Sequence, residues 1–393
     1  MLNSSSRSWI LVACFFLAAV CSSMTSVAIS VHFADRNEGA LVVTGTLLGS
    51  ALAQIFLGPL LAPLFYRYPA RTLGSIAAFA DVGILGVLLA VPSPPVLIAG
   101  AVASAATSTL VIPAIYTTVQ QAHPGEDADA VLFARLDTAR LTGSLLGPLL
   151  GGWLAQTAGL SAAFAAEIAA SLLVAAGFAL QARTSPTDPL AAADSFTARL
   201  VRAPRLLLRN PACREALGSM WAAIVFTSIF NVALVFFAVD TLHAGGLGYA
   251  LLLQAFVIGR LLGSRLGGRV PAPRALGWLV AAGVLMGGGL AVAGLAAHLL
   301  VAIACFTLCG VCNAVQVAAL RLIVVGAVPE STRAHALSTM GTVNTTAMLA
   351  GYVVGAPVVH TLGARTALIV AGVGTAAVML LGVGVRRLRR YFV

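Results

Sequence analysis

The chain has 393 residues, of which 60% are hydrophobic and only 9% are charged. Soluble domains carry about 25% charged residues, so this composition excludes a water-soluble globular protein and indicates a polytopic membrane protein. All 23 basic residues are arginines, and they cluster between apolar segments, so the net charge of +10 indicates orientation in a bilayer rather than nucleic-acid binding.

Twelve apolar segments are long enough to cross a bilayer as helices, which takes about 20 residues. They lie near residues 9–31, 41–65, 72–91, 96–121, 132–156, 161–182, 216–240, 247–268, 275–296, 299–326, 336–359 and 364–385. The first segment imitates a signal peptide, but its length and the segments that follow predict a retained transmembrane helix.

The arginines are distributed unequally between the loops. With a cytoplasmic amino terminus, 18 of the 23 fall on the cytoplasmic side, and only Arg36 and Arg365 fall outside. Arg140, Arg260 and Arg321 lie within apolar segments. Because cytoplasmic loops are enriched in arginine, we predict that both termini are cytoplasmic in a bacterial inner (plasma) membrane.

Residues 183–214 differ in composition from the segments on either side, with four prolines and six arginines. We predict a cytoplasmic basic linker there, with an amphipathic helix on anionic lipid headgroups from about Phe196 to Leu208. The linker separates a bundle of six helices over 1–182 from a second bundle of six over 215–393.

The fifth segment combines an acid, a base and a run of small residues. Glycines at four-residue intervals let a neighbouring helix backbone approach closely, so this run predicts a helix-packing groove. The residues are Asp137, Arg140, Gly143, Gly147, Pro148, Gly151 and Gly152.

The two halves of the chain resemble each other under a shift of 204 residues. Such weak repeats are typical of transporters built from two pseudo-symmetric halves, with the substrate path between them. The shift pairs Gly147 with Gly351, Gly151 with Gly355 and Gly159 with Gly363, whereas Pro148 becomes Tyr352 and Arg140 becomes Asn344.

The six-plus-six segments, the basic central loop and the pattern Gly143-x3-Gly147-Pro148-x2-Gly151-Gly152 resemble the major facilitator superfamily, and the glycine–proline pattern is similar to that of its drug–proton antiporters. The run Leu208 to Arg214, together with Asp81, resembles the branch of macrolide and enterobactin exporters, the transmembrane secretion effectors. This resemblance implies an all-α integral membrane fold of 12 transmembrane helices in two pseudo-symmetric six-helix bundles, acting as a monomer.

One motif departs from the superfamily pattern. Members carry an acidic Gly-x-x-x-Asp-Arg-x-Gly-Arg-Arg-like loop after the second span, whereas this chain has Tyr66 in place of the acid and Pro69 in place of the glycine. The ion pair that stabilises one transport state in relatives is therefore weakened or rebuilt here.

Charges within a membrane helix cost about 2.5–3.5 kcal/mol each and are functional candidates. A carboxyl group that gains or loses an arginine neighbour can exchange protons, so Asp81, Glu167, Asp137 and Arg140 are candidates for proton coupling. Two alternatives stay open. Asp81 and Glu167 could make structural hydrogen bonds, and Asp137 and Arg140 could neutralise each other across one helical turn.

Polar residues in several apolar segments are candidates for a substrate cavity. Two of them have alternative roles. Arg260 could instead bond to backbone carbonyls, and Arg321 could extend its charged end to the membrane surface near the helix end. The candidates are Gln54, Tyr116, Trp221, Asn231, Gln254, Arg260, Asn313, Gln316, Arg321 and Asn344. This sparse lining suits a moderately apolar molecule better than a sugar.

These features favour a secondary transporter that exports a small amphipathic molecule, such as a drug, siderophore or secondary metabolite, by proton antiport. We expect no cofactor or metal site, with the proton gradient as driving force, and no enzymatic activity, because no nucleotide loop or nucleophile–base pair occurs. The alternatives are a proton-coupled importer or facilitator of a metabolite such as a sugar, and a non-transporting membrane sensor or scaffold.

Overall fold

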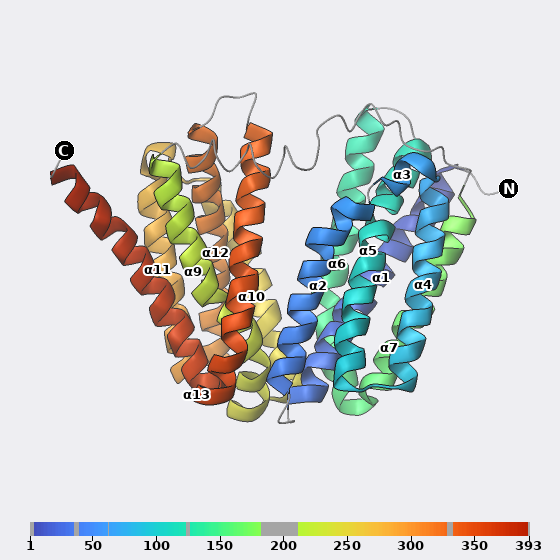
Figure 1. Cartoon of the computed structure of the whole chain (residues 1–393), viewed down its shortest axis with the longest axis horizontal. Coiled ribbons are helices and arrows are strands. Elements are labelled where there is room, and N and C mark those ends of the chain that lie inside the picture. The colour runs from blue at the N-terminus through green and yellow to red at the C-terminus, as the bar shows by residue number, and fades with distance from the viewer. Residues whose placement is uncertain are drawn as a thin grey trace. The chain divides into compact units, whose positions relative to one another are not determined.

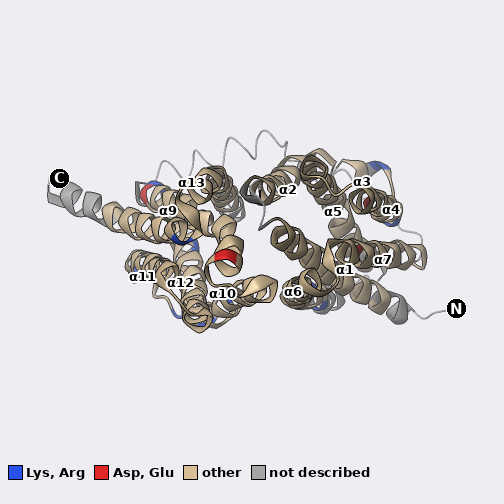
Figure 2. Ribbon diagram, turned by 90° about the horizontal axis from the view of Figure 1, so that it is seen from below, with Lys and Arg blue, Asp and Glu red and all other residues tan. Residues whose placement is uncertain are grey.

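The computed structural model describes residues 4–34, 39–61, 63–122, 126–181, 211–327 and 333–391. These residues are almost entirely helical, and none of them forms a strand. Nine stretches within the described residues are long and apolar enough to cross a membrane. The all-α membrane fold is therefore confirmed, and Figure 2 shows how few charged residues interrupt its helices.

Contacts divide the chain into two compact units, Met1–Ala193 and Asp194–Val393. The division falls inside the stretch predicted as a linker, but residues 182–210, including the predicted amphipathic helix, lie outside the described residues. The next described helix begins at Pro211, so the carboxyl end of the predicted linker is already helical. This early start is explained by proline's preference for the first turn of a helix.

The described residues of the first unit form these helices (Figure 1): α1 Ser4–Ala34, α2 Gly39–Leu61, α3 Leu64–Arg67, α4 Ala70–Ala90, α5 Pro94–Ala122, α6 Glu126–Thr157 and α7 Gly159–Ala179. Helix α1 packs against α6 and α7, α2 against α5, and α4 against α5 and α7. Arg71 at the start of α4 donates hydrogen bonds of 2.7 and 2.8 Å to the carbonyls of Gln181 and Ala179 at the end of α7.

The second unit contains α9 Pro211–Phe236, the π-helix η2 Phe237–Thr241, α10 Gly245–Gly267, the 3-10 turn η3 Ala272–Arg274, α11 Ala275–Leu295, α12 Leu299–Gly326 and α13 Arg333–Tyr391. Helix α13 packs against α9 and α11, and α12 packs against α10 and α11. The last two predicted spans both lie in α13, which changes direction at Gly363, where φ is 77°.

The glycines of α6 do form a packing groove, and α1 fills it. A Cβ atom at Gly143 would come within 2.7 Å of the Phe16 carbonyl oxygen, and one at Gly147 or Gly151 would collide with the carbonyl of Val20 or Met24. The contacted residues on α1 repeat every four residues, as the glycines do. Close approach of two backbones therefore requires glycine at these positions.

The second unit repeats this contact. A Cβ atom at Gly147 would meet Val20 and Ser23, and one at Gly351 in α13 would meet Val225 and Ser228 in α9. The matching turns have the same backbone conformation, with φ of 76° at Gly159 and 77° at Gly363. These paired geometries agree with the internal repeat and support the predicted pseudo-symmetry of the two halves.

Candidate functional site

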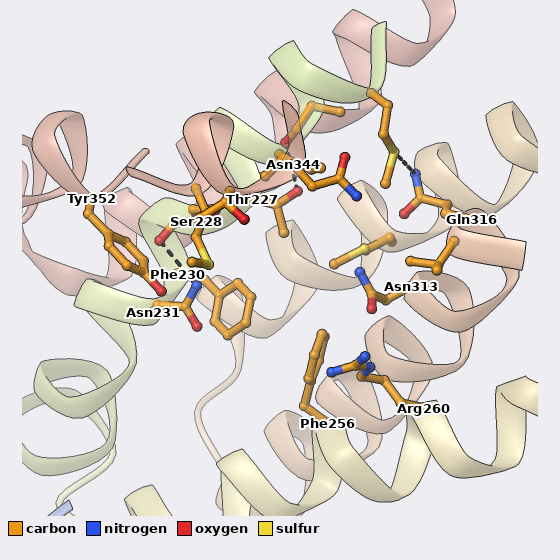
Figure 3. A pocket seen from close by; sticks show the side chains of 17 residues that line it. Thr227, Ser228, Phe230, Asn231, Phe256, Arg260, Asn313, Gln316, Asn344 and Tyr352 are labelled. Atoms are coloured by element: carbon orange, nitrogen blue, oxygen red, sulfur yellow. Dashed lines mark hydrogen bonds between the residues drawn. The ribbon is translucent and has the colours of Figure 1, made fainter. Parts of the chain in front are cut away.

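A cavity of about 360 Å³ lies inside the second unit. Small-molecule sites typically measure about 300–1,000 Å³, so the cavity has room for a compact organic molecule. All five long helices of the unit line it (Figure 3), through Met220, Ala223, Ile224, Thr227, Ser228, Phe230, Asn231, Phe256, Arg260, Met286, Asn313, Gln316, Val317, Asn344, Thr345, Met348 and Tyr352.

Arg260 is held at the cavity by a close crossing of α10 and α12. A Cβ atom at Gly259 would collide with the carbonyl of Thr307, and one at Gly310 would collide with the carbonyl of Phe256. Because both glycines lack a side chain, the two backbones touch beside Arg260. This contact brings Arg260 on α10 and Asn313 on α12 to the same part of the cavity, as Figure 3 shows.

Neutral polar groups surround the arginine. Asn344 contributes an amide oxygen that is buried and has no hydrogen-bond partner among the residues of the described ranges. Gln316, only 2% exposed, directs its amide nitrogen at the sulfur of Met220 at 4.0 Å, a weak acceptor. Asn231 donates a long bond of 3.5 Å to the Ser228 carbonyl. These amides retain hydrogen-bonding capacity that a ligand could use.

The remaining wall is apolar and aromatic. The rings of Phe230 and Phe256 lie 5.3 Å apart between centroids, and Phe230 also contacts the buried ring of Phe306 at 5.7 Å. Methionines from α9, α11 and α13 complete the wall. Thioethers are soft and flexible, so such a wall adapts to ligands of different shape.

The polar groups of this lining are suited to holding a ligand by hydrogen bonds. Its residues include an arginine, amides and hydroxyls, but neither a carboxylate nor a histidine. Among the described residues, no group of three or more histidine, cysteine or acidic side chains is placed to hold a metal ion. Cys309 instead donates its thiol to the Met286 carbonyl at 3.5 Å.

The cavity gathers half of the cavity candidates from the sequence and leaves out the others. Asn231, Arg260, Asn313, Gln316 and Asn344 line it. The side chains of Gln54 and Arg321 are exposed elsewhere, Trp221 donates to Thr346, Gln254 is buried outside the lining, and Tyr116 packs on Phe15 in the first unit.

A second polar cluster lies inside the first unit and contains Asp81. Its carboxylate accepts a hydrogen bond of 3.0 Å from the Thr107 hydroxyl on α5 and one of 2.9 Å from the Ser171 hydroxyl on α7. Asp81 itself belongs to α4, so three helices meet at this carboxylate. Each of its oxygens has one donor.

Glu167 belongs to the same cluster. It lies one turn before Ser171 on α7, is hydrogen-bonded to the side chain of Thr25 on α1, and interacts electrostatically with Asp81. Thr25 also reaches the Ala163 carbonyl at 3.4 Å. The two acids, far apart in sequence, therefore share one partly buried polar network that joins α1, α4, α5 and α7.

Of the other two candidates for proton coupling, Arg140 lies outside this network. Arg140 has an exposed side chain and is not a partner of Asp81 or Glu167. The side chain of Asp137 lies outside the described part of the structure, so its pairing with Arg140 stays a prediction.

Sequence reasoning missed several lining residues, above all Tyr352 and Phe256. A signal for Tyr352 existed, because it replaces Pro148 in the internal repeat, just as Asn344 replaces Arg140. Both substituted positions line the cavity. Phe256 gave no such signal, because an aromatic residue in an apolar helix is as typical of packing or lipid contact as of a binding site.

Solved structures of transporters have the same fold. The nucleoside transporter NupG aligns with a TM-score of 0.76 at 14% identity, over 98% of this chain and 99% of that one. A bacterial homologue of the human lysosomal transporter Spinster gives 0.68 at 14%, over 97% and 98%. The human organic anion transporter MFSD10 (TETRAN) gives 0.57 at 16%, over 97% and 100%.

At these identities the structural likeness shows a shared fold and nothing finer. No curated protein sequence matches the chain. The sequence does match the Major Facilitator Superfamily over residues 9–351, from the first predicted span into the eleventh. The match covers most of the chain, and the helices form the paired bundles that the sequence predicts. The chain therefore belongs to the Major Facilitator Superfamily, as a multi-pass membrane transporter.

Proposed function

We propose that this transporter exports a small amphipathic molecule in exchange for protons, as a drug–proton antiporter of the type that includes the macrolide and enterobactin exporters. The observation that carries the proposal is the partly buried polar network of Asp81 and Glu167. Placing a carboxylate within the membrane costs free energy, so such residues commonly mark functional sites. Two carboxylates that interact inside one bundle can take up and release a proton as that bundle is exposed to either side.

The network has the chemistry that proton exchange requires. Thr107, Ser171 and Thr25 supply hydroxyl groups, which can donate to an ionised carboxylate and accept from a protonated carboxyl group. Both protonation states therefore keep hydrogen-bond partners. A purely structural carboxylate would need donors only.

Substrate-driven proton movement in proteoliposomes tests this proposal. The purified protein is reconstituted with a pH-sensitive dye inside, a proton gradient is imposed, and siderophores, macrolides, dyes and sugars are added in turn. We expect an amphipathic substrate to dissipate the gradient. Asp81→Asn and Glu167→Gln should abolish this coupled movement but leave substrate binding measurable, because each preserves shape and removes one titrating group.

Asp240→Asn in η2 is the matched control, because it makes the same chemical change at an exposed acid in the other unit. It should retain coupling. Normal proton movement in both Asp81→Asn and Glu167→Gln would remove the network from the mechanism. Accumulation of substrate in cells, rather than depletion, would indicate an importer.

We also propose that the protein acts as a monomeric carrier without enzymatic activity in a bacterial inner membrane, with both termini in the cytoplasm. The distribution of arginines between the loops supports this orientation. The proposed organisation is a bundle over 1–182, a basic linker over 183–214 and a bundle over 215–393.

A further inference from the structure

The cavity in the second unit contains a cation and no anion to balance it. Arginine stays protonated under all physiological conditions, and Arg260 contributes that charge to the lining. Its guanidinium makes no hydrogen bond or ion pair with any residue in the described ranges. The cavity is therefore electrostatically positive.

The groups next to the arginine are neutral donors. Asn313 lies beside Arg260 in Figure 3, and Gln316 follows it by one turn on α12. The Gln316 amide nitrogen has only a thioether sulfur as partner, at 4.0 Å. A carboxylate accepts hydrogen bonds from a guanidinium and an amide together, and bonds to such ionised groups are about twice as strong as neutral ones.

Phe230 and Phe256 provide an apolar surface that could contact the apolar part of a ligand. Phe256 and Arg260 are four residues apart on α10, so they project from the same helix face. Figure 3 shows the Phe256 ring beside Arg260, and the Phe230 ring adjoins that of Phe256, with 5.3 Å between their centroids. A ligand with a charged group on Arg260 would place its remaining atoms against these rings and the methionines.

We propose that the substrate of this cavity is an organic monoanion, a carboxylate attached to an aromatic or similarly apolar body. One arginine among neutral donors matches one negative charge, whereas a phosphate dianion would leave charge unbalanced in a low-dielectric site. This inference rests on the proposed function only in treating the bound anion as a transported substrate. Binding of the anion itself needs no proton gradient.

Binding of three matched probes to the purified protein tests the inference. The probes share a naphthalene ring and differ in charge: naphthalene-2-carboxylate, naphthalene-2-carboxamide and naphthalen-2-ylmethylammonium. Isothermal titration calorimetry is done in nanodiscs of neutral phosphatidylcholine, so that no anionic lipid competes. We expect the carboxylate to bind at least about tenfold more tightly than the amide, and the ammonium weakest.

Two arginine variants assign this preference to the cavity. Arg260→Gln should weaken carboxylate binding about 10- to 100-fold and leave amide binding unchanged. Arg321→Gln, the same change on α12 but outside the lining, should bind as the parent does. Arg260→Lys keeps the charge without the planar fork and should recover part of the affinity. Thermal unfolding checks that each variant is folded.

Equal affinities for the three probes, no carboxylate binding to the folded protein, or equal losses in Arg260→Gln and Arg321→Gln would overturn the inference. Its failure is separable from that of antiport. Anion binding without proton movement would contradict antiport alone, whereas proton movement driven only by neutral or cationic substrates would contradict the anion site alone.

Discussion

At the scale of single residues, two amide side chains have buried oxygen atoms without partners, but only one of the two lines the cavity. The side-chain oxygens of Gln254 and Asn344 are both buried without a partner in the described part of the chain. An unsatisfied buried group costs about 1–3 kcal/mol of stability. Asn344 lines the cavity and Gln254 does not, so only the Asn344 amide can contact a ligand bound there.

This difference predicts a separable outcome for two apolar substitutions of similar shape. Gln254→Met and Asn344→Leu should each keep or raise the unfolding temperature, because each removes an unpaired buried group. Asn344→Leu alone should weaken binding of naphthalene-2-carboxylate, because only Asn344 lines the cavity and its amide nitrogen can donate to the carboxylate. Thermal unfolding and calorimetry on the same samples measure both effects. Loss of binding in Gln254→Met would show that the cavity extends to that residue.

At the scale of helices, the α1–α6 crossing depends on glycine. Gly147→Ala should lower the unfolding temperature, because its Cβ would collide with the Val20 carbonyl and push the helices apart. Gly351→Ala should do the same to α9 and α13, where the Val225 carbonyl occupies the equivalent place. Thermal unfolding in detergent micelles is the measurement.

Gly83→Ala and Gly86→Ala in α4 are matched controls, because nothing lies within 4 Å of the Cβ that each would gain. Alanine favours helix over glycine by about 1 kcal/mol, so these variants should be neutral or more stable. Equal destabilisation of all four variants would mean that glycine serves flexibility in these helices rather than close packing.

The helices themselves were predictable because a bilayer leaves a polypeptide few choices. A spanning segment must satisfy its backbone groups internally, so apolar length alone predicts a helix. Each of the twelve predicted spans overlaps a described helix over most of its length, although the second continues from α2 into α3 and the seventh from α9 into η2. The glycine spacing also predicted the packing groove correctly. Boundaries were less predictable, as at Pro211, where proline composition suggested a linker but proline begins a helix.

Which polar side chains meet in a cavity could not be predicted in the same way. Gln254 and Arg260 are six residues apart on α10, about 120° apart around the helix, so they cannot both face one cavity directly. Hydropathy identifies both as unusual in an apolar helix, but it does not show which face of the helix points toward the cavity. Likewise, the partners of Asp81 come from α5 and α7, and no sequence pattern relates Thr107 or Ser171 to it.

At the scale of the whole molecule, arginine placement predicts which ends of the helices face the cytoplasm. Helix α11 offers a compact test, because Arg269 and Arg274 precede it and no charged residue lies between its end at Leu295 and the start of α12. Ala272 and Ala297 flank the helix, and both side chains are exposed. Ala272→Cys should therefore report the cytoplasmic side and Ala297→Cys the opposite side.

Labelling with a membrane-impermeant maleimide distinguishes the two orientations. In intact spheroplasts, Ala297→Cys should react and Ala272→Cys should stay unlabelled until the membrane is opened. The native cysteines Cys14, Cys21, Cys213, Cys309 and Cys312 are buried and Cys305 is partly buried, so the unsubstituted protein supplies the background. The reverse pattern would place the arginine-rich loops outside and contradict the orientation. Labelling of both sites in intact spheroplasts would mean that α11 does not cross the bilayer as one span, which its 21 apolar residues should enforce.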